Sequence, residues 1–210
     1  MADTEITAQI VIDDSIARAK DPDKTQWADS ELLKFLNKTY VYTNTLLIRL
    51  KSELSKTSAP VTMVASTQEY SLATNLPDFY AMADRGVYFA ASGVPLTPVT
   101  VEDKVRCAGA TTATMPSGYY VTDSSIGVID IPTSASVIAY PTLTCKYYKK
   151  ATPLSLASIM PYKNIFNEPM SAFMDHLAMV RVEDLAEEFT AIYNALEESV
   201  LEIVKNRTAI

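Results

Sequence analysis

Two adjoining stretches decide the fold: residues 147–155, YYKKATPLS, and residues 160–189, MPYKNIFNEPMSAFMDHLAMVRVEDLAEEF. The first stretch ends a β-rich run, and Pro161 and Pro169 bracket a corner after it. Pro169 suits the first turn of a helix, where its missing N–H costs nothing. We therefore expect a strand end, a corner and one long amphipathic helix from about residue 169 to 205, with a bend at residues 181–184 as the alternative. Such a part is suited to contacts with other copies of the chain rather than to an active site.

The expected last helix has an apolar stripe and an acidic face. The stripe consists of Phe173, Leu177, Val180, Leu185, Phe189, Ile192, Leu196, Val200 and Ile203. Acidic residues repeat at a spacing of four: Glu183 with Glu187, Asp184 with Glu188, and Glu198 with Glu202. Each such pair destabilises an isolated helix by about 0.2–0.5 kcal/mol. Either this face is solvated, or it meets cations on a neighbour or lines a channel.

Two further helices are expected near the N-terminus. Residues 5–19 place Ile6, Ile10 and Ile16 on one side at helical spacing. Residues 29–56 carry a stripe from Leu32 to Leu54 over about six turns, and Asp29 is the expected N-cap. At ~1.5 Å per residue this second helix would be about 40 Å long, which suits a bundle better than a compact enzyme core.

The middle of the chain changes to short β-rich runs separated by Pro, Gly and Asn-containing corners. Residues 120–131 predict a hairpin around residues 123–125, residues 101–107 a short helix, and residues 107–118 a loop. The fold class is therefore α+β: an antiparallel, up-down helical bundle with an inserted small antiparallel β subdomain. The expected parts are residues 1–58, 59–150 and 151–210, which hold the first helices, the β insert and the last helix with its tail.

Composition and charge bear on the class of protein. The chain has 210 residues, 48% of them hydrophobic, and a formal net charge of −7, of which residues 163–210 carry 9 acidic and 4 basic side chains. A simple nucleic-acid binder would need a basic stripe to neutralise phosphates. The N-terminus has no secretory pattern, and no stretch approaches the ~18 apolar residues that a membrane span needs. We expect a cytosol-like compartment, no membrane, and reduced thiols at Cys107 and Cys145, where a disulfide would be optional.

Signs of catalysis or cofactor binding are weak. His176 is the single histidine, and its helical neighbours are apolar, so it is expected in the core or an interface rather than as a metal ligand or base. The five glycines form no phosphate-binding pattern. Neighbouring acids on a helix point about 100° apart, so they do not converge. We expect no catalytic residue, cofactor or metal.

Five landmarks, in order along the chain, carry a family resemblance. They are residues 21–37 (DPDKTQWADSELLKFLN), 69–89 (EYSLATNLPDFYAMADRGVYF), 93–103 (GVPLTPVTVED), 115–136 (MPSGYYVTDSSIGVIDIPTSAS), and YYKKATPLS with MPYKNIFNEPM. In them the chain resembles the head-to-tail adaptor, or connector, proteins of tailed bacteriophages. It departs from them at Ala28, where the family often has Ser or Thr as helix cap.

The resemblance implies a structural virion protein at the head–tail neck, assembled in the host bacterial cytoplasm. It implies a ring of twelve copies beneath the portal, with tail nozzle, hub or fibre proteins below, and a lumen through which DNA passes without specific binding. The portal contact is expected at the C-terminus, at Ile203, Lys205, Arg207 and Ile210, and the acidic face (Glu183, Glu187, Glu188, Glu198, Glu202) at the lumen or a subunit interface. The alternatives are a stopper or terminator protein, or a virion-associated enzyme that degrades the cell wall.

Overall fold

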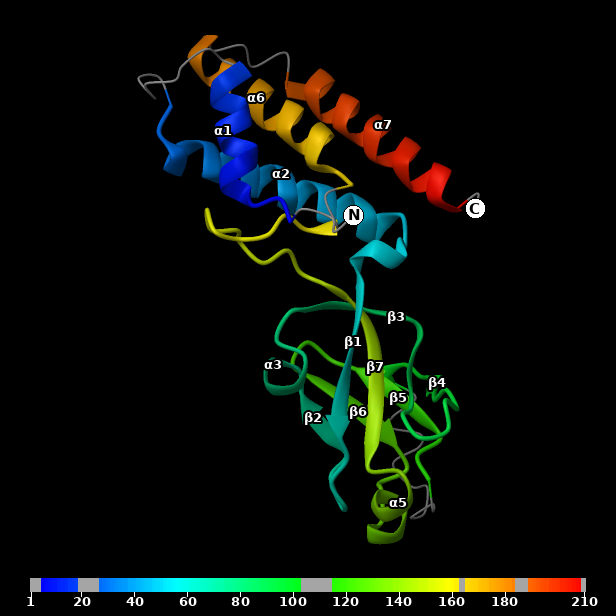
Figure 1. Cartoon of the computed structure of the whole chain (residues 1–210). Coiled ribbons are helices and arrows are strands. Elements are labelled where there is room, and N and C mark those ends of the chain that lie inside the picture. The colour runs from blue at the N-terminus through cyan, green and yellow to red at the C-terminus, as the bar shows by residue number, and fades with distance from the viewer. Residues whose placement is uncertain (1–4, 19–26, 103–114, 163–164, 184–188, 209–210) are drawn as a thin grey trace. The chain divides into compact units, whose positions relative to one another are not determined.

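The chain folds into two compact units, one helical and one built on β-strands (Figure 1). The computed structural model describes residues 5–18, 27–102, 115–162, 165–183 and 189–208. The helical unit contains Met1–Leu54 and Ala151–Ile210, and the β unit is Ser55–Lys150. Within the described residues the protein is a mixed α+β protein with six α-helices and two sheets, which confirms the expected class.

Four helices share the core of the helical unit: α1 (Ala8–Arg18), α2 (Asp29–Arg49), α6 (Asn167–Glu183) and α7 (Phe189–Thr208). Each contributes fully or nearly fully buried side chains, among them Ile12, Leu36, Met174 and Leu196. Burying an aliphatic side chain contributes about 1.5–3 kcal/mol, so the shared apolar core is what holds the four helices together. The expected helix in residues 5–19 is confirmed by α1, but Ile10 is 42% exposed while Val11 and Ile12 are buried, so the predicted apolar side is only partly right.

The start and the end of α2 both differ from expectation. The N-cap is Ala28, in an extended conformation and without a side-chain hydrogen bond, so the prediction of Asp29 as cap is wrong. Asp29 and Glu31 lie in the first turn instead, where carboxylates interact favourably with the helix dipole. The helix ends at Arg49 rather than near residue 56, and a short 3₁₀ turn, η1 (Glu53–Ser55), follows.

The prediction of one unbroken last helix is wrong. The described residues form two helices, α6 and α7, that pack against each other and against α2. Phe173 of α6 lies edge-to-face on Tyr193 of α7, with ring centroids 4.8 Å apart. The ring centroid of Tyr42 on α2 lies 4.7 Å from that of Tyr193. In a continuous helix, residues 20 apart would be separated by about 30 Å. The predicted apolar stripe is therefore divided between two helices that fold back on each other.

The segment that leads into the corner, from residue 151 to 162, is held against α2 by two asparagine side chains of that helix. The Asn37 amide donates to the carbonyl of Leu154 (3.0 Å) and accepts from its N–H (2.6 Å), as a neighbouring strand would. Asn44, which follows Asn37 by seven residues on α2, accepts a hydrogen bond from the Tyr162 hydroxyl at 2.5 Å. Burial, together with the adjacent phenol of Tyr40, raises the pKa of Tyr162 above its usual range. These contacts satisfy backbone and hydroxyl groups that burial would otherwise leave unpaired.

The β unit contains two sheets rather than the single antiparallel sheet expected. Strand order is β1–β7–β3 in the first sheet and β2–β6–β5–β4 in the second, and β4–β5 is a parallel pair while the others are antiparallel. The strands are β1 (Lys56–Thr62), β2 (Glu69–Ser71), β3 (Phe79–Phe89), β4 (Thr97–Pro98), β5 (Gly118–Val121), β6 (Ser125–Ile129) and β7 (Thr142–Lys149). Two short helices, α3 (Leu72–Asn75) and α5 (Ser134–Ala139), complete the unit.

Local sequence explains both a confirmed and a wrong prediction in the β unit. The hairpin around residues 123–125 is confirmed by β5 and β6, and the Thr122 N–H donates to the Ser125 carbonyl at 2.8 Å. Residues 136–139, SVIA, belong by composition to one of the β-rich runs but form most of α5. Thr133 and Ser136 make a capping box there, which overrides the β preference of Val137 and Ile138. The expected helix and loop at residues 101–118 lie mostly outside the described residues.

Candidate functional site

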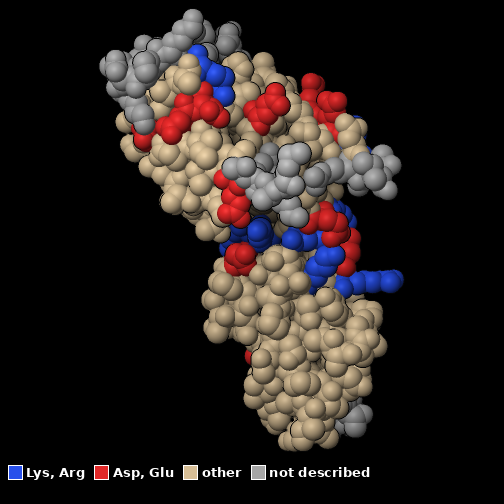
Figure 2. Space-filling view, in the orientation of Figure 1, with Lys and Arg blue, Asp and Glu red and all other residues tan. Residues whose placement is uncertain are grey.

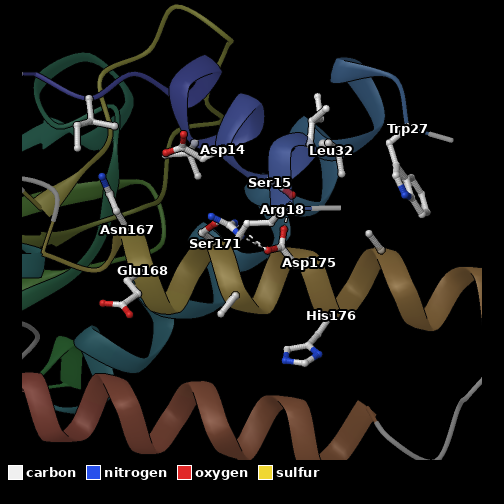
Figure 3. A pocket seen from close by; sticks show the side chains of 15 residues that line it. Asp14, Ser15, Arg18, Trp27, Leu32, Asn167, Glu168, Ser171, Asp175 and His176 are labelled. Atoms are coloured by element: carbon white, nitrogen blue, oxygen red, sulfur yellow. Dashed lines mark hydrogen bonds and ion pairs between the residues drawn. The ribbon is translucent and has the colours of Figure 1, made fainter. Parts of the chain in front are cut away.

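The helical unit contains a pocket of about 670 Å³ between α1, α2 and α6 (Figure 3). Apolar side chains such as Val11, Ile16 and Leu32 form much of its wall, and Trp27 stands at one side. Its polar members are Asp14, Ser15, Arg18, Asn167, Glu168, Ser171, Asp175 and His176.

An ionic network joins α1 to α6 inside this pocket. The Arg18 guanidinium donates to Asp175 Oδ2 from Nη2 at 2.7 Å and from Nε at 3.0 Å. The Ser15 hydroxyl donates to the other oxygen of Asp175, and Arg18 donates to the hydroxyl of Ser171. The Arg18 side chain is 50% exposed and that of Asp175 20%, so the ion pair is partly screened by solvent. The network joins α1 to α6 through Arg18 and Asp175, which lie 157 residues apart in the sequence.

The chemistry of this pocket favours structure over catalysis. Asp175 could orient a base or a nucleophile, but both of its oxygens are engaged with Ser15 and Arg18. The imidazole of His176 points away from that network (Figure 3) and is exposed, so His176 does not lie in the core, and its position at an interface stays a prediction. The Ser15 hydroxyl does donate to a carboxylate, as a nucleophile donates to its base, but that carboxylate is held by the Arg18 guanidinium. No cluster of His, Cys, Asp and Glu in the described ranges could hold a metal ion.

A second hollow, of about 550 Å³, runs along α2, and we call it the α2 groove. It is lined by Lys34, Asn37, Lys38, Val41, Tyr42, Thr45, Pro153 and Tyr193. The α2 members recur at intervals of three and four residues, which places them along one side of the helix. Pro153 is held beside them by the bonds between Asn37 and Leu154.

The electrostatics of the α2 groove are mainly positive. Lys34 and Lys38 are exposed, and the Lys38 ammonium lies 5.6 Å from the centre of the Phe35 ring. Burial raises the pKa of Tyr42, and the charge of Glu197 raises it further, whereas Arg49 lowers it. Tyr42 therefore lies between a carboxylate of α7 and a guanidinium of α2, beyond the end of the groove that holds the two lysines.

The sequence matches a known protein family over almost its whole length. The family model of the SU10 adaptor protein matches residues 6–209, which include both units. The chain belongs to this family. A comparison with curated proteins gave no match. Membership makes the chain a phage adaptor, a structural component of the virion, and implies a non-enzymatic role and assembly with portal and tail proteins in general.

The residues expected at the portal lie at the end of α7 in the adaptor. Lys205 is exposed, while Ile203 is half-buried and packs with Val204 against the core of the helical unit. Arg207 lies within the last turn of α7, and Ile210 lies outside the described residues. The backbone thus places the two cations at the negative end of the helix dipole.

The acidic face expected in the adaptor is divided among different parts of the chain. Glu198 and Glu202 are exposed on α7. Glu183 is the last residue of α6, and Glu187 and Glu188 lie outside the described residues. The structure therefore brings together only one of the three expected like-charge pairs as a described surface.

Most of the β unit carries no charge on the face drawn in Figure 2. Charged side chains on that face gather on the helical unit and at the end of the β unit where the chain enters and leaves. Residues 57–68, 86–101 and 131–145 contain no Lys, Arg, Asp or Glu, yet Val64, Val94 and Ile138 are exposed, Ile138 to 83%. These stretches of the β unit therefore expose apolar side chains without a charged residue among them.

Sequence reasoning missed the Arg18–Asp175 network and the α2 groove. The network joins residues far apart in sequence, so no local pattern could have indicated it. The groove did have a signal, because Lys34 and Lys38 lie four residues apart beside the apolar stripe. Cys145 is a buried free thiol, as expected, and Cys107 lies outside the described residues. Among the helices described, none is long and apolar enough to cross a membrane.

Proposed function

We propose that this adaptor is a head-to-tail connector at the virion neck, assembled in the bacterial cytoplasm. In the proposal it forms a ring of twelve copies beneath the portal, joins the capsid to the tail and continues the DNA channel. The observation that carries the proposal is the family match over residues 6–209, which spans the helical unit and the inserted β unit together.

The helical unit supplies the body of the proposed ring as an antiparallel helical bundle. Its support is the single core to which α1, α2, α6 and α7 all contribute. DNA passes the lumen without specific binding, because a chain of net charge −7 shares the sign of the phosphates. A wall of the same sign removes electrostatic attraction to the passing duplex.

The portal contact in this proposal is the C-terminal end of α7, with Ile203, Lys205, Arg207 and Ile210. Its support is the exposure of Lys205 beyond the last core contacts at Ile203 and Val204. A short terminal segment of this kind can order on a partner and gain contacts at that moment. Tail nozzle, hub or fibre proteins would meet the opposite side of the ring.

The test is reconstitution of the full-length adaptor with the portal protein of the same phage. Mass photometry and electron microscopy of the mixture should show portal rings with about twelve added copies. Portal alone is the control for ring size. Portal rings without added mass at saturating adaptor would overturn the proposal. Binding only to a portal that already carries another connector, or only to the tail, would assign the chain to a stopper or terminator role instead.

A further inference from the structure

One end of the β unit is formed by three separate segments of the chain. The pairing of β1 with β7 places Lys56 opposite Tyr148 and Thr62 opposite Thr142. The unit is Ser55–Lys150, so the chain enters and leaves it at the Lys56 end, and no chain connection to the helical unit leaves from the other end. That free end consists of residues 62–68, 89–95 and 131–142, which we call the β tip, and α5 lies within it (Figure 1).

Backbone hydrogen bonds join the three segments of the β tip. The Met63 N–H donates to the Pro141 carbonyl at 2.9 Å, and the Ala90 N–H donates to the Thr142 carbonyl at 3.0 Å. The capping box at the start of α5 fixes the conformation of the third segment. A surface that is already ordered loses little conformational entropy when a partner binds, so the β tip is a favourable place for a contact.

The β tip exposes apolar side chains and contains no charged residue. Ile138 is 83% exposed, Val64 53%, Val94 48% and Ile131 42%. Smaller exposed residues accompany them in the same segments: Ala90, Ala91, Pro95, Ala135, Ala139 and Pro141. None of the three segments contains Lys, Arg, Asp or Glu. Single exposed apolar residues are ordinary on a protein surface, but a charge-free gathering of them is typical of the centre of a protein–protein interface.

The charges of the chain are divided unequally between the two units. The β unit has seven acidic and seven basic residues, so the whole net charge of −7 belongs to the helical unit. Duplex DNA needs cations to neutralise its phosphates, and the β tip contains none. A charged protein surface would lose its hydration against the β tip without gaining a partner of opposite charge. The chemistry of the β tip therefore fits an uncharged, apolar protein surface.

The sheet edges favour contact through these side chains over the addition of a strand. In the first sheet, the edge strand β1 contains Pro60, which has no N–H to donate, and the edge strand β3 is bulged between Met82 and Val87. In the second sheet, the edge strands β2 and β4 have only three and two residues. Short, bulged or proline-containing edges prevent a sheet from pairing with a strand of another chain. A partner is therefore expected to meet the apolar side chains of the β tip.

Two partners of the proposed connector are poor candidates for the β tip. The portal contact is proposed at the end of α7, which belongs to the other unit. Neighbouring copies in a ring are related by rotation about one axis, whereas pairing of one β tip with another is isologous and needs a twofold axis. Such pairing would join two rings instead of closing one. The tail-side protein is the partner class that remains.

We propose that the β tip docks an uncharged, apolar surface of a tail-side protein, with Ile138, Val94 and Val64 as its central contacts. This inference rests on the proposed function and deepens it, because it names the surface by which the connector holds the tail. Ile138 is the main expected contact, since its side chain is the most exposed of the four large apolar residues of the β tip.

Complementation of a phage that lacks the adaptor gene tests this inference. The tip variant is Val94→Asp with Ile138→Asp, which places unpaired charges in an apolar contact. The matched control, Ile10→Asp with Val101→Asp, makes the same changes at exposed residues outside the β tip. We expect the tip variant to give DNA-filled heads that carry the adaptor but have at least about tenfold fewer tails. The control variant should give normally tailed particles.

A second variant separates the loss of apolar contact from charge repulsion and from misfolding. Val94→Ser with Ile138→Ser removes the apolar groups without adding charge, and it should also reduce tailing. Both variants change exposed side chains, so each purified chain should keep its thermal midpoint within about 3 °C of the parent. Normal tailing with both variants would overturn the inference. Heads of the tip variant that lack the adaptor would overturn it too, because the β tip would then be needed inside the ring or on the portal.

Cysteine labelling gives an independent test. In a Cys107→Ser chain, whose Cys145 is buried, Ile138→Cys should react with maleimide on heads that carry the adaptor but no tail. On tailed particles the same thiol should react at least about tenfold more slowly, because the tail covers it. Ile10→Cys is the control and should react equally on both. Equal reaction of Ile138→Cys on both kinds of particle would overturn the inference.

The outcomes separate this inference from the connector role. Adaptor rings on portal that attach tails independently of the β tip would overturn the inference alone. Binding of the free chain to purified tails that the tip variant loses, without any ring on portal, would support the inference and overturn the connector role. Dimers of the free chain, or binding to phosphatidylcholine vesicles, that the tip variant loses while tailing is unchanged would overturn the inference in favour of a second copy or a lipid surface.

Discussion

Gly127→Ala is expected to disrupt the core of the β unit through one contact. Gly127 lies on β6 directly opposite Tyr120 on β5, and the tyrosine ring covers it. A Cβ at residue 127 would lie 2.0 Å from Tyr120 Cζ, 2.3 Å from its hydroxyl oxygen and 2.5 Å from Cε1. Tyr120 is 1% exposed, so the ring can make room only by moving through packed surroundings.

The magnitude follows from two consequences of that movement. Overpacking a filled core costs about 1–3 kcal/mol. Moving the ring also breaks the 2.7 Å hydrogen bond from the Tyr120 hydroxyl to Glu69 Oε1, and a bond to a charged group contributes about 1.5–3 kcal/mol. The free energy of unfolding should therefore fall by about 2.5–6 kcal/mol. At an ordinary strand position the same substitution would stabilise the protein by about 0.5–1 kcal/mol, so the sign itself is diagnostic.

Urea unfolding followed by circular dichroism measures this loss. Tyr120→Phe is the first control, since it removes the hydrogen bond but keeps the ring, and should cost about 1.5–3 kcal/mol. Tyr120→Ala is the second, because without the ring the added methyl has space, and Gly127→Ala should then cost less than about 1 kcal/mol. If Gly127→Ala costs the same in both backgrounds, or less than about 1 kcal/mol in the parent, the ring contact is not the cause.

Four further predictions follow from burial and exposure. Burial raises the pKa of Cys145 to about 12, so in a Cys107→Ser chain maleimide should label it at least about a hundredfold more slowly than it labels the unfolded chain; equal rates would contradict this. The pKa of Tyr162 is raised by burial, so its contribution to stability is complete below its unfolded pKa of about 10 and is lost as pH rises further; unfolding free energy should fall above about pH 10, and less steeply in Tyr162→Phe. Truncation after Val204 keeps the core contacts of α7, so the thermal midpoint should change by less than about 3 °C while portal attachment is lost; intact attachment would move the contact into the helical body. His176→Ala removes an exposed side chain and should change unfolding free energy by less than about 0.5 kcal/mol with attachment intact, and a specific loss of attachment would contradict that reasoning.

Periodicity predicted the helical parts of the fold better than their ends. The stripe from Leu32 to Leu47 is buried as expected, because a 3.6-residue period leaves one face to meet the core. The cap at Ala28 matches the position that the family resemblance indicates, but residue preference favoured Asp29, because alanine has no side-chain acceptor for the first N–H groups of the helix. The separation of α6 from α7 corresponds to the alternative of a bend at residues 181–184, and periodicity could not decide for it because both helices carry the same apolar period on either side of residues 184–188.

The candidate surfaces were predictable only in part. Glu198 and Glu202 could be placed on one helical face from their spacing alone, and the structure shows that face exposed. The groove needed tertiary information, because Tyr193 and Pro153 reach Val41 from distant parts of the chain. Residues that line a hollow share no local pattern unless one element supplies most of them, and here α2 supplies six of the eight.

The charge pattern of the helical unit is easier to explain in an assembly than in an isolated chain. Lys34 with Lys38 and Glu198 with Glu202 are like charges four residues apart, and each pair costs its own helix about 0.2–0.5 kcal/mol. Against a typical domain stability of 5–15 kcal/mol that cost is tolerable, so the monomer folds with both pairs. An oppositely charged surface on a partner would offset the repulsion within each helix. The Debye length of about 8 Å at physiological salt leaves contact distances largely unscreened while removing longer-range repulsion between acidic subunits. A short-range charge match can therefore act between subunits that all carry net negative charge.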